Sequence, residues 1–175
     1  LFRSLLRAVV DLTARNMREY VGNGGSREYV REKKSELADA AMHHVVVRAG
    51  STGTQLLGFA AYRIVEEEGV RVGYVYELQL EAHARGMRLG THLLAEVESA
   101  ARAAGTSGLM LTVHLRNEAA RRFYPNTAPP RTVMLTAPSS GPSPLGIYTH
   151  RLRLHFPEIV VGMEQALLMR EVAIE

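Results

Sequence analysis

The hydrophobic and polar positions in the N-terminal part of the chain follow the period of a helix. Its apolar residues recur every three or four positions, at Leu5, Leu6, Val9, Val10, Leu12 and Met17. This spacing is typical of a helix with one buried face, so we predict an amphipathic helix over residues 5–20. A glycine-rich loop over 21–26 follows, and Ser26 is placed to cap a second helix that runs to about residue 41.

The rest of the chain alternates between short β-rich runs and longer helical patterns. We predict strands starting at 45–47 and spanning 55–64, 70–80, 109–113 and 149–154, and helices over 91–104, 117–124 and 158–172. Gly105 ends the first of these helices, and a Pro/Ser-rich segment covers 125–144. This order predicts an α/β fold with a mixed sheet, and not a doubly wound one.

Composition narrows the class of protein. The 175 residues are 46% hydrophobic and 22% charged, which is typical of a single globular domain, so we expect one domain over residues 1–175. No apolar run approaches the ~20 residues that span a bilayer, and we expect no membrane partner. The net charge of +3 comes from scattered arginines, so direct nucleic-acid binding is not expected.

Cysteine is absent from the chain, and the histidines are few and scattered, which limits the chemistry that the protein can perform. With no cysteine, the chain has no disulfide, thiolate metal site or cysteine nucleophile, which is compatible with the cytoplasm and nucleus. The seven histidines form no pair with a carboxylate at metal-binding spacing, so we predict no metal.

The most informative segment is a strand that ends in a basic, glycine-containing turn before a helix. The strand runs from Tyr74 to Leu80, and the turn reads Arg-Gly-Met-Arg-Leu-Gly-Thr over residues 85–91. The start of a helix leaves backbone N–H groups unpaired at the positive end of the helix dipole, so it favours an anion. We therefore predict a phosphate or pyrophosphate site here. The turn lacks the Gly-Lys-Ser/Thr of a P-loop and the three glycines of a dinucleotide fingerprint.

The turn resembles the Arg/Gln-x-x-Gly-x-Gly/Ala motif of the GNAT superfamily of N-acetyltransferases. A second element, Asn-Glu-Ala-Ala-Arg-Arg-Phe-Tyr over 117–124, is similar to that family's Asn-x-x-Ala-x-x-x-Tyr. The resemblance implies a mostly antiparallel mixed sheet flanked by helices, a bulged fourth strand and a V-shaped cleft that binds acetyl-CoA without a metal. The implied cofactor contacts are Leu78, Gln79, Leu80, Arg85, Gly86, Met87, Arg88, Leu89, Gly90, Thr91, Asn117 and Tyr124.

Within that family, residues 74–81 look like the fourth strand of the NatD-type N-α-acetyltransferases, which acetylate histone N-termini. Residues 11–17 and the helix around 32–34 look like that subgroup's first two helices. The resemblance implies acetyl transfer to the α-amine of a protein N-terminus, with a histone tail starting Ser-Gly as partner, by an enzyme acting as a monomer.

The chemistry of acetyl transfer suggests roles for three side chains. An α-amine titrates near ~7.7–8.0 and a lysine near ~10.4, so an α-amine needs only a modest base acting through water. Glu77 is the candidate base, and an ion-pair or solvated role is the alternative. Tyr76 and Tyr124 complete the catalytic set: Tyr76 can orient a water, and Tyr124 can protonate the leaving sulfur or simply pack. A backbone N–H near Leu78 is the candidate oxyanion donor.

Four residues are candidates for binding the substrate. Tyr74 and Tyr76 are expected to flank its first residues, or else to be core aromatics. Glu67, in the acidic run 66–68, is expected to hold a basic residue of the substrate, although most such runs are solvated turns. His44 falls where the NatD-type subgroup has an aromatic residue, so the resemblance implies that it stacks on the peptide or holds a water, and a plain strand histidine is the alternative.

Two departures from the family pattern bear on the prediction. Arg88 stands at the family's middle glycine, and a positive φ there would strain it by about 1 kcal/mol. Pro125 follows Tyr124, and the Gly-Phe pair normally found after it is missing. Two other functions therefore stay open: a family member that acetylates lysine or a small-molecule amine, and a catalytically silent CoA-binding module.

Overall fold

The structure, a computed structural model, describes residues 2–21, 26–50, 55–67, 69–124, 132–136, 149–155 and 170–174. The four helices and seven strands of these residues are α1 (Phe2–Met17), α2 (Arg27–Leu37), β1 (His43–Ala49), β2 (Gln55–Glu67), β3 (Val70–Leu80), α3 (Leu89–Ala103), β4 (Gly108–His114), α4 (Glu118–Phe123), β5 (Thr132–Thr136), β6 (Thr149–His155) and β7 (Arg170–Ile174). A 3-10 turn over Ala82–Ala84 links β3 to the segment that leads into α3.

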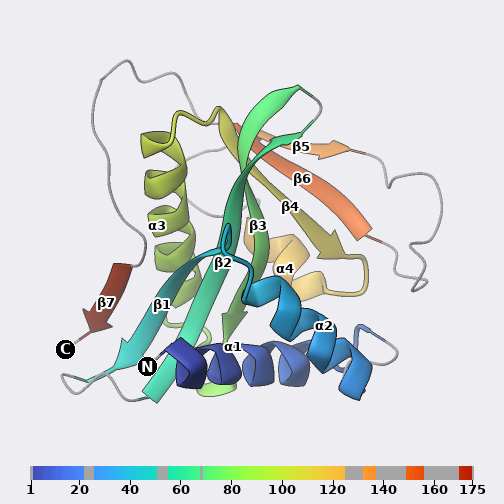
Figure 1. Ribbon diagram of the computed structural model, residues 1–175. Helices are drawn as coiled ribbons and strands as arrows, with labels where there is room; N and C mark the ends of the chain where they lie inside the picture. Colours follow the sequence, from blue (N-terminus) through green and yellow to red (C-terminus); the bar gives the residue numbers. More distant parts are fainter. Residues whose placement is uncertain are drawn as a thin grey trace.

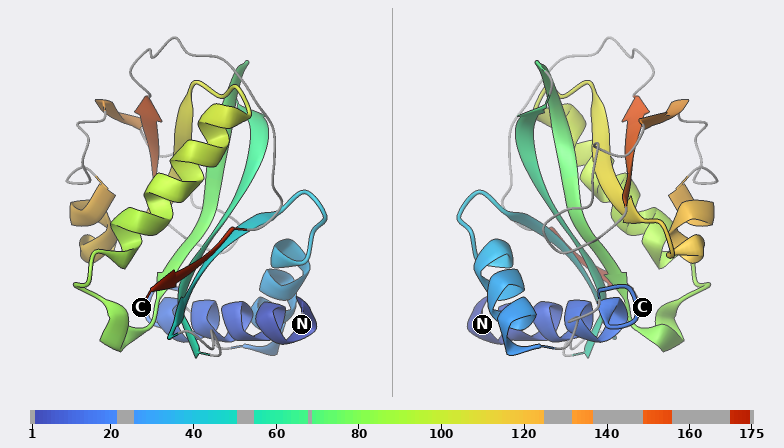
Figure 2. Two further views of the ribbon diagram at one scale, coloured as in Figure 1. Left: turned by 90° about the vertical axis from the view of Figure 1, so that its left-hand side faces the viewer. Right: turned by 90° about the vertical axis from the view of Figure 1, so that its right-hand side faces the viewer.

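The strands form one mixed sheet, in the order β5-β6-β4-β3-β2-β1-β7. The pairs β1/β2, β2/β3, β4/β6 and β5/β6 are antiparallel, whereas β3/β4 and β1/β7 are parallel. The sheet separates α1 and α2 on one face from α3 and α4 on the other (Figures 1 and 2). This arrangement confirms the predicted α/β fold.

Alternation along the strands gives the sheet two hydrophobic faces. Val45 and Val47 join the core cluster that contains the buried face of α3, whereas Val46 between them joins the cluster under α1 and α2. The helices meet these faces with the apolar positions seen in the sequence: Val9 and Leu12 of α1 are buried, for example. The two-sided burial holds β1, β2 and β3 in place between the helix layers.

Two helix ends show the expected local chemistry. The Ser26 hydroxyl accepts a hydrogen bond from the backbone N–H of Tyr29 at 3.1 Å, so it caps α2 as predicted. Gly105 follows α3 with a φ of +73°, and Thr106 N–H returns to the carbonyl of Ala101. A left-handed glycine in this position ends the helix and satisfies its last carbonyls.

β3 contains a bulge and separates from β4 part-way along its length. Against β2, Glu77 pairs with Ala61 and Val75 with Tyr62, so Tyr76 is the extra residue. β3 pairs with β4 only from Gly73 to Val75, although β4 continues to His114 and β3 to Leu80. The two strands therefore diverge (Figure 1). The bulged strand and the V-shaped opening, both expected from the resemblance, are present.

The C-terminal part corrects two predictions. Residues 170–172 were predicted as the end of a helix, but they lie in strand β7, which pairs in parallel with Val45–Ala49 of β1. For the Pro/Ser-rich segment 125–144 no strand was predicted, but it contains β5, which pairs with β6. Both strands depend on partners distant in sequence, which local periodicity does not show. The predicted helix residues 158–169 lie outside the described residues.

The helices of the described residues are all too short or too polar to cross a lipid bilayer.

Candidate active site

Two adjoining cavities open where β3 and β4 diverge. The carboxylate cavity, of about 460 Å³, is lined among others by Glu32, Glu36 and Glu77. The arginine cavity, of about 440 Å³, is lined among others by Arg85 and Arg88. The two cavities share the lining residues Met17, Leu78, Gln79, Asn117, Ala120 and Tyr124. A long ligand can therefore lie in the arginine cavity and extend one end into the carboxylate cavity.

The bulge decides which side chains face the carboxylate cavity. Strict alternation after Val75 would place Tyr76 and Glu77 on opposite faces of β3. Instead, Tyr76 packs against the cluster under α1 and α2, and Glu77 reaches Lys33 of α2, while Leu78 packs on the α3 side. The extra residue thus brings Tyr76 and Glu77 to the same side.

Glu77 is buried and held by two donors. Its side chain is 7% exposed, and Oε1 lies 2.8 Å from Nζ of Lys33. Oε2 accepts a hydrogen bond of 2.8 Å from Nε2 of Gln79. Lys33 also donates to Oε2 of Glu36 at 2.6 Å. Glu77 therefore lies in the cavity as predicted, but as part of a network with a lysine that the sequence analysis did not assign to the site.

Electrostatics keep Lys33 charged and the two tyrosines of the cavity neutral. Burial alone would lower the pKa of Lys33, but the carboxylates of Glu77 and Glu36 outweigh burial and raise that pKa. Burial, followed by the charge of Glu77, raises the pKa of Tyr29 to about 12, and the same two causes raise the pKa of Tyr124. Near neutral pH, Tyr29 and Tyr124 thus keep their hydroxyl protons and can act as donors.

The predicted substrate residues do not all reach the cavity. Tyr76 lines it, and its ring lies 5.1 Å from the ring of Tyr74 and 5.2 Å from the guanidinium carbon of Arg63. Tyr74 shares a hydrogen bond of 2.5 Å with the hydroxyl of Thr112, a residue of the cavity wall. Tyr74 thus stands next to the cavity and supports its wall.

Glu67 and His44 lie outside both cavities. Glu67 is at the end of β2, opposite Val70. His44 is buried, with Nε2 at 2.9 Å from the carbonyl oxygen of Leu37 and its ring beside Phe59. Burial lowers the pKa of His44, which keeps it neutral. The structure therefore gives His44 the role of a strand histidine in the core, which was the alternative to substrate binding.

The arginine cavity is built on the turn before α3. Five of the residues predicted to contact the cofactor line it: Arg85, Gly86, Arg88, Gly90 and Thr91. Arg88 precedes the helix with a φ of +61°, and its side chain makes no capping hydrogen bond. The first backbone N–H groups of α3 have no partner within the helix, so they are donors for an anion.

The remaining predicted cofactor residues divide into two groups. Leu78, Gln79, Leu80, Asn117 and Tyr124 line the arginine cavity. Met87 and Leu89 do not: Met87 is 62% exposed, and Leu89, the first residue of α3, is buried in the core between α3 and the sheet. These two alternate with the cavity-facing positions of the turn, and their contact with a cofactor stays a prediction.

Asn117 has a second function besides lining both cavities. Its Oδ1 accepts a hydrogen bond of 3.0 Å from the backbone N–H of Ala120, so it caps α4. Tyr124 closes the same helix and is buried. The Asn-x-x-Ala-x-x-x-Tyr element thus sets the position of α4 at the wall between the cavities.

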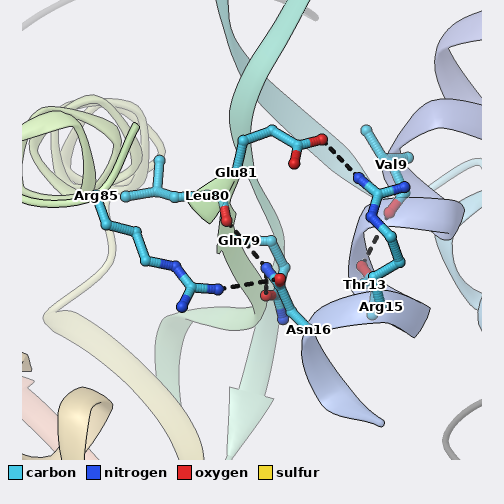
Figure 3. Close-up of polar contacts among 8 residues, drawn as sticks. All are labelled: Val9, Thr13, Arg15, Asn16, Gln79, Leu80, Glu81 and Arg85. Atoms are coloured by element: carbon cyan, nitrogen blue, oxygen red, sulfur yellow. Dashed lines mark hydrogen bonds and ion pairs between the residues drawn. The ribbon is translucent and has the colours of Figure 1, made fainter. Parts of the chain in front are cut away.

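Several residues of the site were missed because they come from α1 and α2. Asn16 bridges Gln79 and Arg85, and Tyr29, Lys33 and Glu36 line the carboxylate cavity (Figure 3 shows Asn16). Asn16 and Lys33 lie in segments that carry the subgroup resemblance. Their partners are distant in sequence, so spacing alone could not assign them a role.

The residues present fit a cofactor with a pyrophosphate and a linear arm. The arginines and the free start of α3 match a pyrophosphate, and the stretch of β3 beyond Val75 is not paired with β4. Its backbone can therefore bind an amide-containing arm lying in the opening. Among the described residues, no group of three or more His, Cys, Asp or Glu side chains is placed to hold a metal ion.

Solved structures of similar fold include PaiA N-acetyltransferase from Thermoplasma acidophilum, in complex with coenzyme A. It has a TM-score of 0.57 and 14% identity, over 85% of this chain and 92% of that one. Naa20 from Chaetomium thermophilum, in complex with a bisubstrate analogue, has a TM-score of 0.51 and 18% identity, over 62% of this chain and 64% of its own. Nourseothricin acetyltransferase has a TM-score of 0.51 and 21% identity, over 62% of each chain.

At these identities the likeness concerns the fold, and the chain spans less than two thirds of the latter two proteins. The family assignment comes from the sequence: a profile of the acetyltransferase (GNAT) family matches residues 7–126, which include both cavities. This chain is a member of the acetyltransferase (GNAT) family.

Proposed function

We propose that this protein transfers the acetyl group of acetyl-CoA to the free α-amine of a protein N-terminus. A histone tail that starts Ser-Gly is the substrate favoured by the sequence resemblance. The observation that carries the proposal is that the two cavities adjoin and share lining residues. Acetyl-CoA bound by its pyrophosphate in the arginine cavity can therefore extend its thioester toward Glu77 in the carboxylate cavity.

The residues of this chain have complementary roles in the proposed reaction. The arginine cavity binds the pyrophosphate of acetyl-CoA, and the exposed edge of β3 aligns its arm. The α-ammonium of the substrate enters the carboxylate cavity and loses a proton through water to Glu77. The neutral amine then attacks the thioester carbonyl.

The rest of the step follows from the same geometry. A new C–N bond forms as the C–S bond breaks, and a backbone N–H near Leu78 is the proposed donor to the oxyanion. The leaving sulfur takes a proton from Tyr124, which is protonated near neutral pH because burial raises its pKa, and the tyrosine recovers a proton that the attacking nitrogen releases as it becomes an amide. The products are an N-acetylated peptide and CoA.

The carboxylates at the cavity favour a cationic substrate. Glu32 and Glu36 line it besides Glu77, and Lys33 balances only part of their charge. A protonated α-amine followed by basic residues is attracted to such a site before it gives up its proton. An α-amine also needs less help than lysine to deprotonate, since their pKa values differ by about 2.5 units.

One observation favours a second candidate, a catalytically silent CoA-binding module. Both carboxylate oxygens of Glu77 already accept donors, Lys33 on one side and Gln79 on the other. If the ammonium of Lys33 stays in place, Glu77 is poorly placed to take a proton from a substrate. The two candidates differ in turnover and agree in cofactor binding.

A peptide panel tests the proposal. Three basic peptides starting Ser-Gly are offered with acetyl-CoA: one with a free α-amine, one with a blocked α-amine, and one with free α-amine and no lysine. We expect both free peptides to gain one acetyl group at the N-terminus, by mass spectrometry, and the blocked peptide none. Acetylation of the blocked peptide on lysine would reassign the substrate, and a small amine serving better than any peptide would do the same.

The variant Glu77→Gln separates the enzyme from the silent module. The amide keeps the size of the side chain and removes its basicity, so we expect turnover to fall at least a hundredfold. Acetyl-CoA should still bind within a few-fold of the unchanged protein, because the arginine cavity is intact. Wild-type protein that binds acetyl-CoA but acetylates no acceptor would support the silent module.

A further inference from the structure

A series of three hydrogen bonds connects Arg85, in the turn before α3, to Glu77. An Nη of Arg85 donates to Oδ1 of Asn16 at 3.0 Å, and Nδ2 of Asn16 donates to Oε1 of Gln79 at 3.0 Å (Figure 3). Nε2 of Gln79 then donates to Oε2 of Glu77 at 2.8 Å. Asn16 comes from α1, so this helix supplies the middle of a connection between two parts of the site.

The two ends determine the orientation of both amides. A guanidinium only donates and an ionised carboxylate only accepts. Oδ1 of Asn16 must therefore face Arg85, and Nε2 of Gln79 must face Glu77. Asn16 is held further because Nδ2 also donates to the carbonyl of Leu80 at 3.0 Å. All donors thus point toward Glu77, and reversing either amide would place like groups against each other.

We propose that Asn16 is a positioning residue, which holds Gln79 in the orientation that fixes the Glu77 carboxylate while also holding Arg85. This role of Asn16 rests on the proposed function, in which Glu77 is the base. Asn16 would set the distance between the group that grips the cofactor and the group that receives the proton. An error in that distance costs turnover more than binding.

The test uses an isosteric variant and a matched control on the same helix. Asn16→Asp keeps an acceptor for Arg85 but removes both N–H donors, so Gln79 must turn its amide and present Oε1 to Glu77. Gln79→Met removes the link without adding charge. The control is Arg15→Ala. Arg15 lies on the same helix, its Nη2 pairs with Oε1 of Glu81 at 2.6 Å, and it takes no part in the series of hydrogen bonds (Figure 3).

Kinetics on the best acceptor give the first readout. We expect kcat to fall about tenfold in Asn16→Asp and in Gln79→Met, the value of about one hydrogen bond. The double variant should fall no further than either single variant, while Asn16→Asp keeps acetyl-CoA binding within about threefold. Arg15→Ala should stay within twofold of the unchanged protein. An equal loss in Arg15→Ala, or additive losses in the double variant, would overturn the proposal.

A second readout needs no acceptor. The side-chain amide resonance of Gln79, assigned by its disappearance in Gln79→Met, should shift in Asn16→Asp and in Glu77→Gln and stay unchanged in Arg15→Ala. An unshifted resonance in Asn16→Asp would overturn the proposal. A shifted resonance in a protein that acetylates no α-amine would leave Asn16 in its role and reject the proposed function alone.

Discussion

Lys33 of α2 and Glu77 of β3 form an ion pair of 2.8 Å inside the carboxylate cavity, and Glu77 is nearly fully buried. The pair joins a helix to the bulged strand at the position where chemistry is proposed. An isolated buried carboxylate is costly, and the ion pair with Lys33 offsets the cost of burying Glu77. It also means that a substrate ammonium has to share or replace this partner.

We predict that Lys33→Met destabilises the protein. Removing one partner of a buried pair costs about 3–5 kcal/mol, and the 20% exposure of the Lys33 side chain reduces this to about 2–3 kcal/mol. The free energy of unfolding, measured in urea, should fall by that amount. In the double variant Lys33→Met, Glu77→Gln most of the loss should be recovered, since no buried charge remains. A loss below about 0.5 kcal/mol in the single variant would contradict the account.

Stability should fall at high pH through Tyr29. Burial and Glu77 raise its pKa from 10.0 to about 12 in the folded protein. Between these values the folded state holds a proton that the unfolded state has released, so the free energy of unfolding falls as pH rises from about 10 to about 12. Below pH 10 both states are protonated and Tyr29 adds no pH dependence.

Denaturation of the unchanged protein and Tyr29→Phe between pH 8 and 11.5 measures this effect. The variant should lose stability less steeply above pH 10, and the two should run parallel below it. Equal slopes above pH 10 would show that Tyr29 is not shifted. Lys33, whose pKa is also raised, contributes in the same direction and is present in both proteins.

Arg88 combines backbone strain with a proposed role in binding. Among the residues that the structure describes, Arg88 is the one non-glycine residue with a positive φ, at +61°. The family has a glycine at this position, so the backbone strain predicted for an arginine there is present. Arg88→Gly should stabilise the protein by about 0.5–1 kcal/mol. It should also weaken acetyl-CoA binding several-fold, because a guanidinium at the cavity is lost.

Arg88→Ala is the matched variant for that prediction. It removes the charge and keeps a side chain in the left-handed conformation, so affinity should fall as in Arg88→Gly without a gain in stability. Thermal unfolding of the two variants measures the effect on stability, and calorimetric titration measures the effect on acetyl-CoA binding. If Arg88→Gly is less stable than Arg88→Ala, the strain argument fails.

Sequence predicted what depends on neighbours along the chain. The limits of β3 at Val70 and Leu80, the cap at Ser26 and the end of α3 at Gly105 agree with the structure, because each is set by residues within a few positions. The basic turn and its place before a helix were also evident locally. The predictions of the fold and of the cofactor part of the site were based on these local features.

Sequence did not predict what depends on pairing across the fold. The resemblance implied a bulge in this strand, but its position at Tyr76 appears only in the register between β2 and β3, and this position turns Glu77 toward α2. Asn16 meets Gln79 across 63 positions of sequence, and β7 exists through its pairing with β1. Such contacts are decided by tertiary packing, so the role of α1 and α2 in the site had to come from the structure.

The central claim is that the arginine cavity grips the pyrophosphate of acetyl-CoA and so directs its thioester toward Glu77. Calorimetric titration of acetyl-CoA into the protein and into Arg85→Met tests it most directly. We predict saturable binding at one site, weakened about tenfold or more in the variant, since a charge-assisted hydrogen bond contributes about 1.5–3 kcal/mol. No heat of binding with the unchanged protein, or equal affinity in the variant, would contradict the claim.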